Sequence, residues 1–176
     1  MSDERTDRIR ALIRNVPDFP KPGVQFKDIS PLLADPEGFT TALDLIAEAY
    51  AGKRVDTIVG IESRGFIFGA ALAARMSASF VPARKPGKLP AETVRQSYEL
   101  EYGSDAVEIH ADALERGERV VIVDDLIATG GTARATGDLV LGQGAELLGY
   151  AFVIELGFLG GVERLAPHHV VSLLAY

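Results

Sequence analysis

The stretch that most constrains the fold is residues 120–132, V-V-I-V-D-D-L-I-A-T-G-G-T. Its first four residues are apolar and β-branched, which is typical of a strand buried on both faces of a parallel sheet. Two acids, Asp124 and Asp125, follow this strand, and a turn of small residues comes next. A helix is expected to begin at Thr132. A strand, a short turn and a helix in this order predict an α/β fold with a mostly parallel sheet flanked by helices.

The turn after the two acids is suited to bind an anion. Its small side chains let backbone N–H groups approach a ligand, and the dipole of the following helix adds to the attraction. The turn lacks the G-K-[ST] of a Walker A loop, and the chain has no G-x-G-x-x-G fingerprint. Acids beside a bare phosphate would repel it, whereas a sugar phosphate offers a cis-diol to the acids and a 5′-phosphate to the turn. An ordinary glycine-rich connection would explain neither the paired acids nor the threonine-flanked glycines. The residues of the turn are Ala128, Thr129, Gly130, Gly131 and Thr132.

Periodicity along the rest of the chain predicts strands that alternate with helices. Apolar residues at helical spacing predict an amphipathic helix over residues 3–16, and Asp35-Pro36 is a favourable start for a second helix. Residues 17–29 hold three prolines and are expected to be irregular, and the pattern also breaks down over residues 84–97. A hairpin is expected around residues 103–105. The expected strands are 57–61, 79–83, 98–102, 106–110, 119–123, 147–155 and 169–174, with further helices at 65–75 and from 132.

Composition limits the classes of protein that the chain can belong to. A hydrophobic fraction of 47% with 24% charged residues is typical of a globular domain and not of a disordered chain. The net charge of −7 argues against a broad nucleic-acid-binding surface. No apolar run approaches the roughly 20 residues of a membrane helix, so no membrane partner is expected. The charged N-terminus is unlike a signal peptide, so a cytoplasmic location is expected. The absence of cysteine excludes disulfides and thiolate metal sites.

Three predicted strand ends carry polar residues that suit a charged ligand. They are residues 62–65, 84–88 and 124–132, and ligands of parallel sheets bind at the carboxyl ends of strands. The first contains Arg64, and the second contains three cations, Arg84, Lys85 and Lys88. A pyrophosphate needs such cations together with backbone N–H groups. A solvated charge cluster is the alternative interpretation of the three cations. Residues 89–97 are polar and suit a mobile lid that excludes water.

Residues 120–132 resemble the phosphoribosyl-pyrophosphate-binding signature of the type I phosphoribosyltransferase family. Four further runs resemble the members of that family that act on adenine, in the same order and at similar spacing, from about residue 15 to Tyr176. They are P-x-F-P-x-P-G-V-x-F-x-D-I-S-P, S-R-G-F-x-F-G, R-K-x-G-K-L-P and S-Y-x-L-E-Y-G. The resemblance implies one domain over residues 1–176, with a base-binding hood at about 1–34 and a core at about 35–176. It also implies a flexible lid hairpin over 84–110 and a homodimer.

The resemblance assigns expected roles to particular residues. Asp124 and Asp125 would hold the ribose diol, and the small-residue turn would hold the 5′-phosphate. The pyrophosphate positions are Ser63, Arg64, Arg84, Lys85 and Lys88. The adenine positions are Gln25, Phe26, Lys27 and Leu156, although the family commonly has arginine where this chain has Lys27. The catalytic positions are Glu101, Tyr102 and Arg64, and a non-proline cis peptide is expected at Glu62-Ser63.

The implied reaction converts adenine and 5-phosphoribosyl 1-pyrophosphate to AMP and pyrophosphate. Mg²⁺ would be carried by pyrophosphate and ribose oxygens, with waters completing its shell and no dedicated protein ligands. The three histidines are too few and too scattered for a metal triad. One alternative is a phosphoribosyltransferase for another base, such as xanthine or orotate. Another is a non-catalytic regulator that senses phosphoribosyl pyrophosphate and binds DNA, which would need an added helical domain and a basic face.

Overall fold

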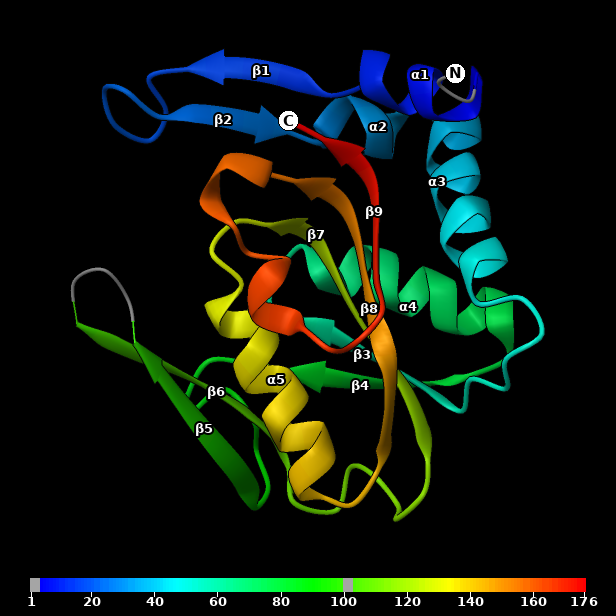
Figure 1. The fold of residues 1–176 in the computed structure, drawn as a ribbon, viewed down its shortest axis with the longest axis vertical. Helices are drawn as coiled ribbons and strands as arrows, with labels where there is room; N and C mark the ends of the chain where they lie inside the picture. Colours follow the sequence, from blue (N-terminus) through cyan, green and yellow to red (C-terminus); the bar gives the residue numbers. More distant parts are fainter. Residues whose placement is uncertain (1–3, 100–102) are drawn as a thin grey trace. The chain divides into compact units, whose positions relative to one another are not determined.

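The structure, a computed structural model, describes residues 4–99 and 103–176 and divides the chain into two compact units, residues 1–48 and 49–176. The larger unit is built on a five-stranded sheet in the order β4-β3-β7-β8-β9 (Figure 1). All its neighbouring strands pair in parallel, which confirms the predicted α/β class. The strands are β3 (Thr57–Ile61), β4 (Ser79–Ala83), β7 (Arg119–Ile127), β8 (Glu146–Glu155) and β9 (Val170–Ala175).

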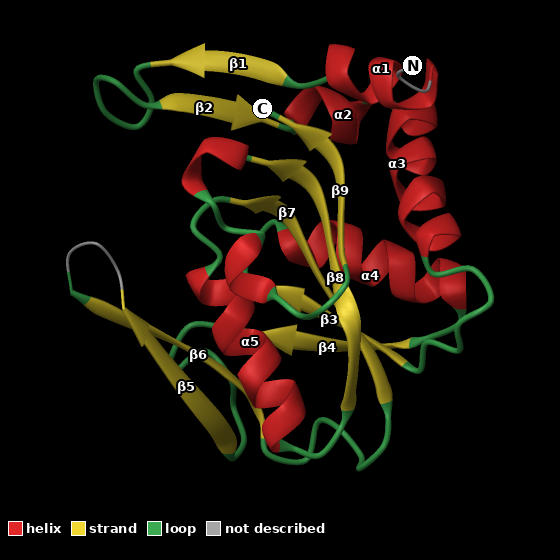
Figure 2. Ribbon diagram, in the orientation of Figure 1, coloured by secondary structure: helices red, strands yellow, loops and turns green. Residues whose placement is uncertain are grey.

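Two helices connect neighbouring strands of this sheet in opposite directions. Helix α4 (Gly65–Met76) connects β3 to β4, and α5 (Gly131–Gly142) connects β7 to β8 (Figure 2). Right-handed crossovers that lead in opposite directions place their helices on opposite faces of the sheet. The strand order therefore reverses between β3 and β7, and sheets of this kind bind ligands at the carboxyl ends of the strands beside that reversal.

The apolar runs that predict the strands form the core of the larger unit. Every residue of β3 is buried, and so are residues 120–123 of β7 and residues 149–154 of β8. Val59, Ile122 and Phe152 belong to this hydrophobic cluster. Strands buried on both faces are read in sequence as continuous apolar runs, which is why these elements were predictable.

An antiparallel hairpin, β5 (Thr93–Glu99) and β6 (Ser104–His110), lies beside α5 (Figure 1). The expectation that residues 93–97 are irregular is wrong, because they pair with β6 along their whole length. Val94 and Tyr98 share one face of β5 and pack against the hydrophobic core. That alternation spans few residues, which makes it a weak signal in the sequence.

The smaller unit contains α1 (Glu4–Ala11), β1 (Arg14–Pro17), β2 (Gln25–Asp28) and α2 (Ser30–Ala34), followed by α3 (Pro36–Ala49). The predicted helix over 3–16 is too long, because it ends at Ala11 and Val16 lies in β1 opposite Phe26 of β2. The expectation of irregular structure is likewise wrong for residues 25–28. Pairing between β1 and β2 provides backbone hydrogen bonds that outweigh the helical spacing of Ile9, Leu12, Ile13 and Val16.

Two 3₁₀ helices, η1 (Gly157–Leu159) and η2 (Glu163–Leu165), lie between β8 and β9. Across residues 4–99 and 103–176, no helix combines the length and apolar character that crossing a membrane requires.

Candidate active site

The three strand ends singled out in the sequence lie on adjacent strands. The order β4-β3-β7 brings residues 84–88, 62–65 and 124–132 to the same edge of the sheet. The structure therefore confirms that these segments are neighbours, at the reversal of the strand order where ligands of such sheets bind.

The turn between β7 and α5 forms one side of a cavity of about 140 Å³. Gly130 precedes the helix in a left-handed conformation, with φ of 78°. A Cβ atom at Gly130 would lie 2.5 Å from the carbonyl oxygen of Gly161, so only glycine allows this close approach. The backbone N–H groups of the first turn of α5 have no partners within the helix, so this end suits an anion. The cavity is lined by Asp124, Leu126, Ile127, Ala128, Thr129, Gly130, Gly131, Thr132, Ala133 and Phe152.

The two acids lie within β7 and not after it. The strand continues to Ile127, so Asp124 and Asp125 lie within it, and their carboxyl groups lie close enough to interact with each other. Asp124 lines the cavity, and its Oδ1 accepts a hydrogen bond of 2.8 Å from the backbone N–H of Asp125. The Asp125 side chain is 5% exposed and pairs with Arg64, with 2.9 Å between Oδ2 and Nε.

Burial dominates the electrostatics of this pair of acids. Burial, together with the adjacent charge of Asp125, raises the pKa of Asp124 well above its usual range. Burial also raises the pKa of Asp125, although the Arg64 guanidinium opposes this effect. A ligand that brings hydroxyl donors or a cation would stabilise the charged form of these two carboxyl groups.

Glu62 connects the β3–α4 turn to the end of β4. Its carboxylate accepts a hydrogen bond of 3.0 Å from Nη2 of Arg84 and one of 2.8 Å from the backbone N–H of Lys85. The hydrogen bond from Arg84 is the main reason that the pKa of Glu62 is lowered. The peptide bond between Glu62 and the exposed Ser63 is cis, as expected from the resemblance.

The three cations after β4 have different surroundings. Besides its contact with Glu62, Arg84 donates a hydrogen bond of 2.9 Å from Nη1 to the carbonyl oxygen of Lys88. The side chain of Lys88 is exposed. Lys85 is partly buried and turns toward the hairpin. The cluster is therefore an ordered set of contacts and not a uniformly solvated group of charges.

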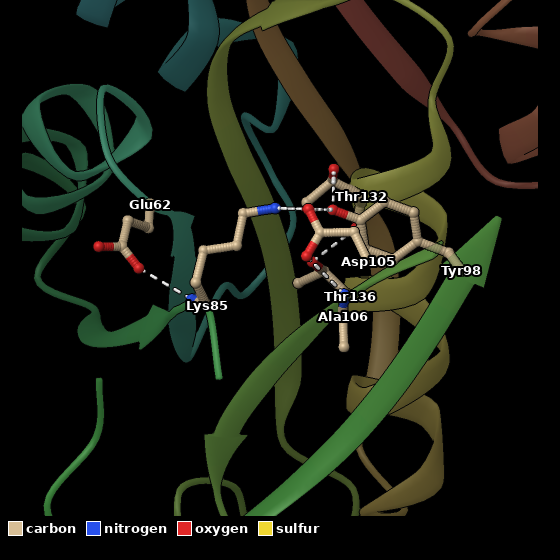
Figure 3. A network of polar contacts seen from close by, with 7 residues as sticks. All are labelled: Glu62, Lys85, Tyr98, Asp105, Ala106, Thr132 and Thr136. Atoms are coloured by element: carbon tan, nitrogen blue, oxygen red, sulfur yellow. Dashed lines mark hydrogen bonds and ion pairs between the residues drawn. The ribbon is translucent and has the colours of Figure 1, made fainter. Parts of the chain in front are cut away.

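Lys85, Tyr98, Asp105 and Thr132 form a polar network that the sequence did not reveal (Figure 3). The Lys85 ammonium pairs with Asp105. Burial lowers the pKa of Lys85, but the hydrogen bonds with Asp105 and Tyr98 outweigh burial, so that the pKa is raised. The hydrogen bond from Lys85 lowers the pKa of Asp105. Asp105 was expected only as a turn residue, because its pairing with Lys85 depends on the register of the hairpin.

The residues expected to contact adenine lie on two different elements. Gln25, Phe26 and Lys27 are in β2, and the Phe26 ring packs edge-on against Phe19 with 5.1 Å between the centroids. Leu156 directly follows β8, and its N–H donates a hydrogen bond to the carbonyl oxygen of Ile127. The expected catalytic residues Glu101 and Tyr102 lie outside the described residues.

Comparison with known proteins identifies relatives over nearly the whole chain. A profile described as "Phosphoribosyl transferase domain" matches residues 31–169. An adenine phosphoribosyltransferase of Acidobacterium capsulatum is 58% identical over 168 residues, which cover 96% of this chain and 93% of the relative. The crystal structure of the Rhodothermus marinus adenine phosphoribosyltransferase aligns with a TM-score of 0.94 at 50% identity, covering 98% of both chains.

A Saccharomyces cerevisiae adenine phosphoribosyltransferase, solved with an imino-altritol bisphosphate and adenine, aligns with a TM-score of 0.92 at 44% identity. That alignment covers 97% of this chain and 98% of the yeast chain. The sequence relatives, the fold and the position of the polar residues at one edge of the sheet all indicate the same family. The chain belongs to the phosphoribosyltransferase family.

Proposed function

We propose that this protein transfers the 5-phosphoribosyl group from phosphoribosyl pyrophosphate to adenine, releasing pyrophosphate and forming AMP in purine salvage. The observation that carries the proposal is the position of Asp124 beside the anion-binding turn of α5, in one small cavity. This juxtaposition suits a ligand that has a diol and a phosphate on the same sugar. Relatives that are more than half identical over nearly the whole chain are named for the same reaction.

In this proposal the turn at residues 128–132 binds the 5′-phosphate through backbone N–H groups and threonine hydroxyls. Asp124 accepts hydrogen bonds from the ribose hydroxyls. Asp125 is buried and paired with Arg64, so it assists the ribose site and also fixes the Arg64 guanidinium. Fixing these groups before the reaction positions C1 of the sugar for attack.

The pyrophosphate end is assigned to Ser63, Arg64, Lys85 and Lys88. As the bond from C1 to pyrophosphate weakens, negative charge accumulates on the leaving group and positive charge on the sugar ring. Cations held beside the leaving group stabilise that charge more in the transition state than in the ground state. Arg84 belongs to the same side, where its hydrogen bonds to Glu62 and the Lys88 carbonyl keep the loop in shape.

For the base, the resemblance supports contacts from Gln25, Phe26, Lys27 and Leu156, with the Phe26 ring stacking on adenine. Backbone groups of residues 24–27 would read the amino donor at C6 and the acceptor at N1. Glu101, next to Tyr102, would handle the proton of the attacking base.

Mg²⁺ fits the chemistry of this site as an ion carried by the substrate. Asp124 has a raised pKa, and a nearby cation would stabilise its charged form. Over the described ranges, 4–99 and 103–176, no three acidic or histidine side chains group together as metal ligands. As the resemblance implies, the ion would be held mainly by pyrophosphate and ribose oxygens, and its role would be to neutralise the leaving group. A homodimer in the cytoplasm is part of the same proposal.

A product assay with a panel of bases tests the function. The purified chain is incubated with phosphoribosyl pyrophosphate, Mg²⁺ and adenine, hypoxanthine, xanthine or orotate, and nucleotides are separated by chromatography. AMP as the main product is expected. Preferential turnover of another base would contradict the assignment of adenine, and binding of phosphoribosyl pyrophosphate without turnover of any base would favour the sensing regulator.

A further inference from the structure

Lys85 is held at both ends by neighbouring segments (Figure 3). Its backbone N–H donates to Glu62, and its ammonium pairs with Asp105 and donates a hydrogen bond of 3.0 Å to the Tyr98 hydroxyl. The Tyr98 hydroxyl in turn donates to Oδ2 of Asp105 at 3.2 Å. Two hairpin side chains therefore engage two of the three N–H donors on the ammonium of a lysine that is assigned to pyrophosphate.

The same tyrosine also occupies the anion-binding turn. The Thr132 hydroxyl donates a hydrogen bond of 2.8 Å to the Tyr98 oxygen. The Tyr98 ring covers the start of α5, since a Cβ atom at Gly131 would lie 3.1 Å from its Cδ2. The donor that Thr132 would offer to a 5′-phosphate is therefore engaged by the hairpin.

This network is incompatible with the substrate assigned to the site. Lys85 and Thr132 both donate to one atom, the Tyr98 oxygen. The Lys85 ammonium and the Thr132 hydroxyl are therefore both within hydrogen-bonding distance of that single oxygen. The 5′-phosphate and the pyrophosphate are attached to C5 and C1 of a ribose, which keeps the two groups apart. The Asp105 carboxylate would also repel an anion placed at Lys85.

We propose that Asp105 and Tyr98 form an internal latch, which occupies Lys85 and Thr132 in the ligand-free protein and which phosphoribosyl pyrophosphate must displace. This inference rests on the assignment of Lys85 and Thr132 to the two anionic ends of the substrate. The latch lowers the affinity for the substrate, because part of the binding free energy is used to break it. It also keeps the hairpin against the turn until a ligand with two anionic ends arrives.

The test is the dissociation constant of phosphoribosyl pyrophosphate, measured by calorimetry on the full chain with Mg²⁺ and without a base. Asp105→Asn and Tyr98→Phe are each expected to tighten binding by about threefold to fivefold, on the scale of a partly exposed ion pair. Tyr98→Phe removes no charge, so its effect cannot come from reduced repulsion of the ligand. Asp112→Asn, which removes one exposed charge just beyond the hairpin, is the control and is expected to leave the constant unchanged.

Weaker or unchanged binding in either latch variant would overturn the proposal, because the side chain would then position the substrate or contribute nothing. Lys85→Ala separates this result from a failure of the underlying assignment. If Lys85→Ala weakens binding while the latch variants do not tighten it, the site is as assigned and only the latch is wrong. If Lys85→Ala has no effect, the assignment of the pyrophosphate end fails and the latch fails with it.

Discussion

Replacing Gly130 by alanine tests the geometry of the phosphate-binding turn. Gly130 has φ of 78°, and a Cβ atom there would lie 2.5 Å from the carbonyl oxygen of Gly161. Gly117 is a matched control, since its φ is 79° and nothing lies within 4 Å of an added Cβ. The two substitutions share the backbone cost and differ only in the overlap.

The magnitudes follow from these two contributions. A left-handed alanine costs about 1 kcal/mol, so Gly117→Ala is expected to lower the melting temperature by about 2–4 °C. Gly130→Ala adds an overlap with a backbone atom that no side-chain rotation relieves, which costs a further ~1–3 kcal/mol. Because relief of this overlap distorts the turn that binds the 5′-phosphate, the KM for phosphoribosyl pyrophosphate should rise by about tenfold or more.

Thermal unfolding and steady-state kinetics on the two variants decide the matter. The expected result is a larger loss of stability in Gly130→Ala than in Gly117→Ala, together with a raised KM in Gly130→Ala alone. Equal stabilities and equal KM values in the two variants would refute the reasoning, since the overlap with the Gly161 carbonyl oxygen would then affect neither stability nor binding.

Three further predictions concern the acids and the base. Asp124→Asn should raise the melting temperature at neutral pH while weakening substrate binding. Folding raises the pKa of Asp124, so the charged carboxylate lowers the free energy of unfolding as the pH rises above the ordinary pKa of an aspartate. The gain in melting temperature should shrink as the pH is lowered toward that value, and a gain that is constant with pH would contradict this. Glu101→Gln should lower kcat by ~100-fold with little change in the affinity for phosphoribosyl pyrophosphate, and equal loss of that affinity would point to a role in shaping the site. Lys27→Arg should leave the ratio of kcat/KM for adenine over hypoxanthine unchanged, whereas Phe26→Ala should weaken both bases by about 1 kcal/mol or more; a tenfold shift of the ratio in Lys27→Arg would place selectivity in that side chain.

The sequence predicted the elements whose burial is complete. Residues 120–123 are buried on both faces, and the continuous apolar run identified their strand and its parallel sheet. The strand was nevertheless predicted to stop at Val123, because two acids are rare inside a buried strand. Burial of Asp125 is sustained by Arg64, and no local pattern reveals this pairing between β7 and the turn after β3.

Short elements with few buried residues were the ones that the sequence did not reveal. Strand β1 has no fully buried residue, and β2 has none either, so their stability depends on pairing with each other. Dependence on strand pairing also explains why the network of Lys85 with the hairpin was not predicted. Lys85 was correctly placed at the sheet edge, but Asp105 reaches it only through the pairing of Tyr98 with Asp105 across β5 and β6.

The continuation of β7 through its two acids makes this part of the site preorganised. Pairing between β7 and β8 persists from Asp124, opposite Phe152, to Ile127, opposite Glu155. A carboxylate on such a ladder has already lost its backbone freedom during folding, so binding a sugar costs little further conformational entropy there. Amide hydrogen exchange at residues 124–127 should therefore be slow with and without ligand, and the ordering that accompanies catalysis falls to the segments around this rigid strand.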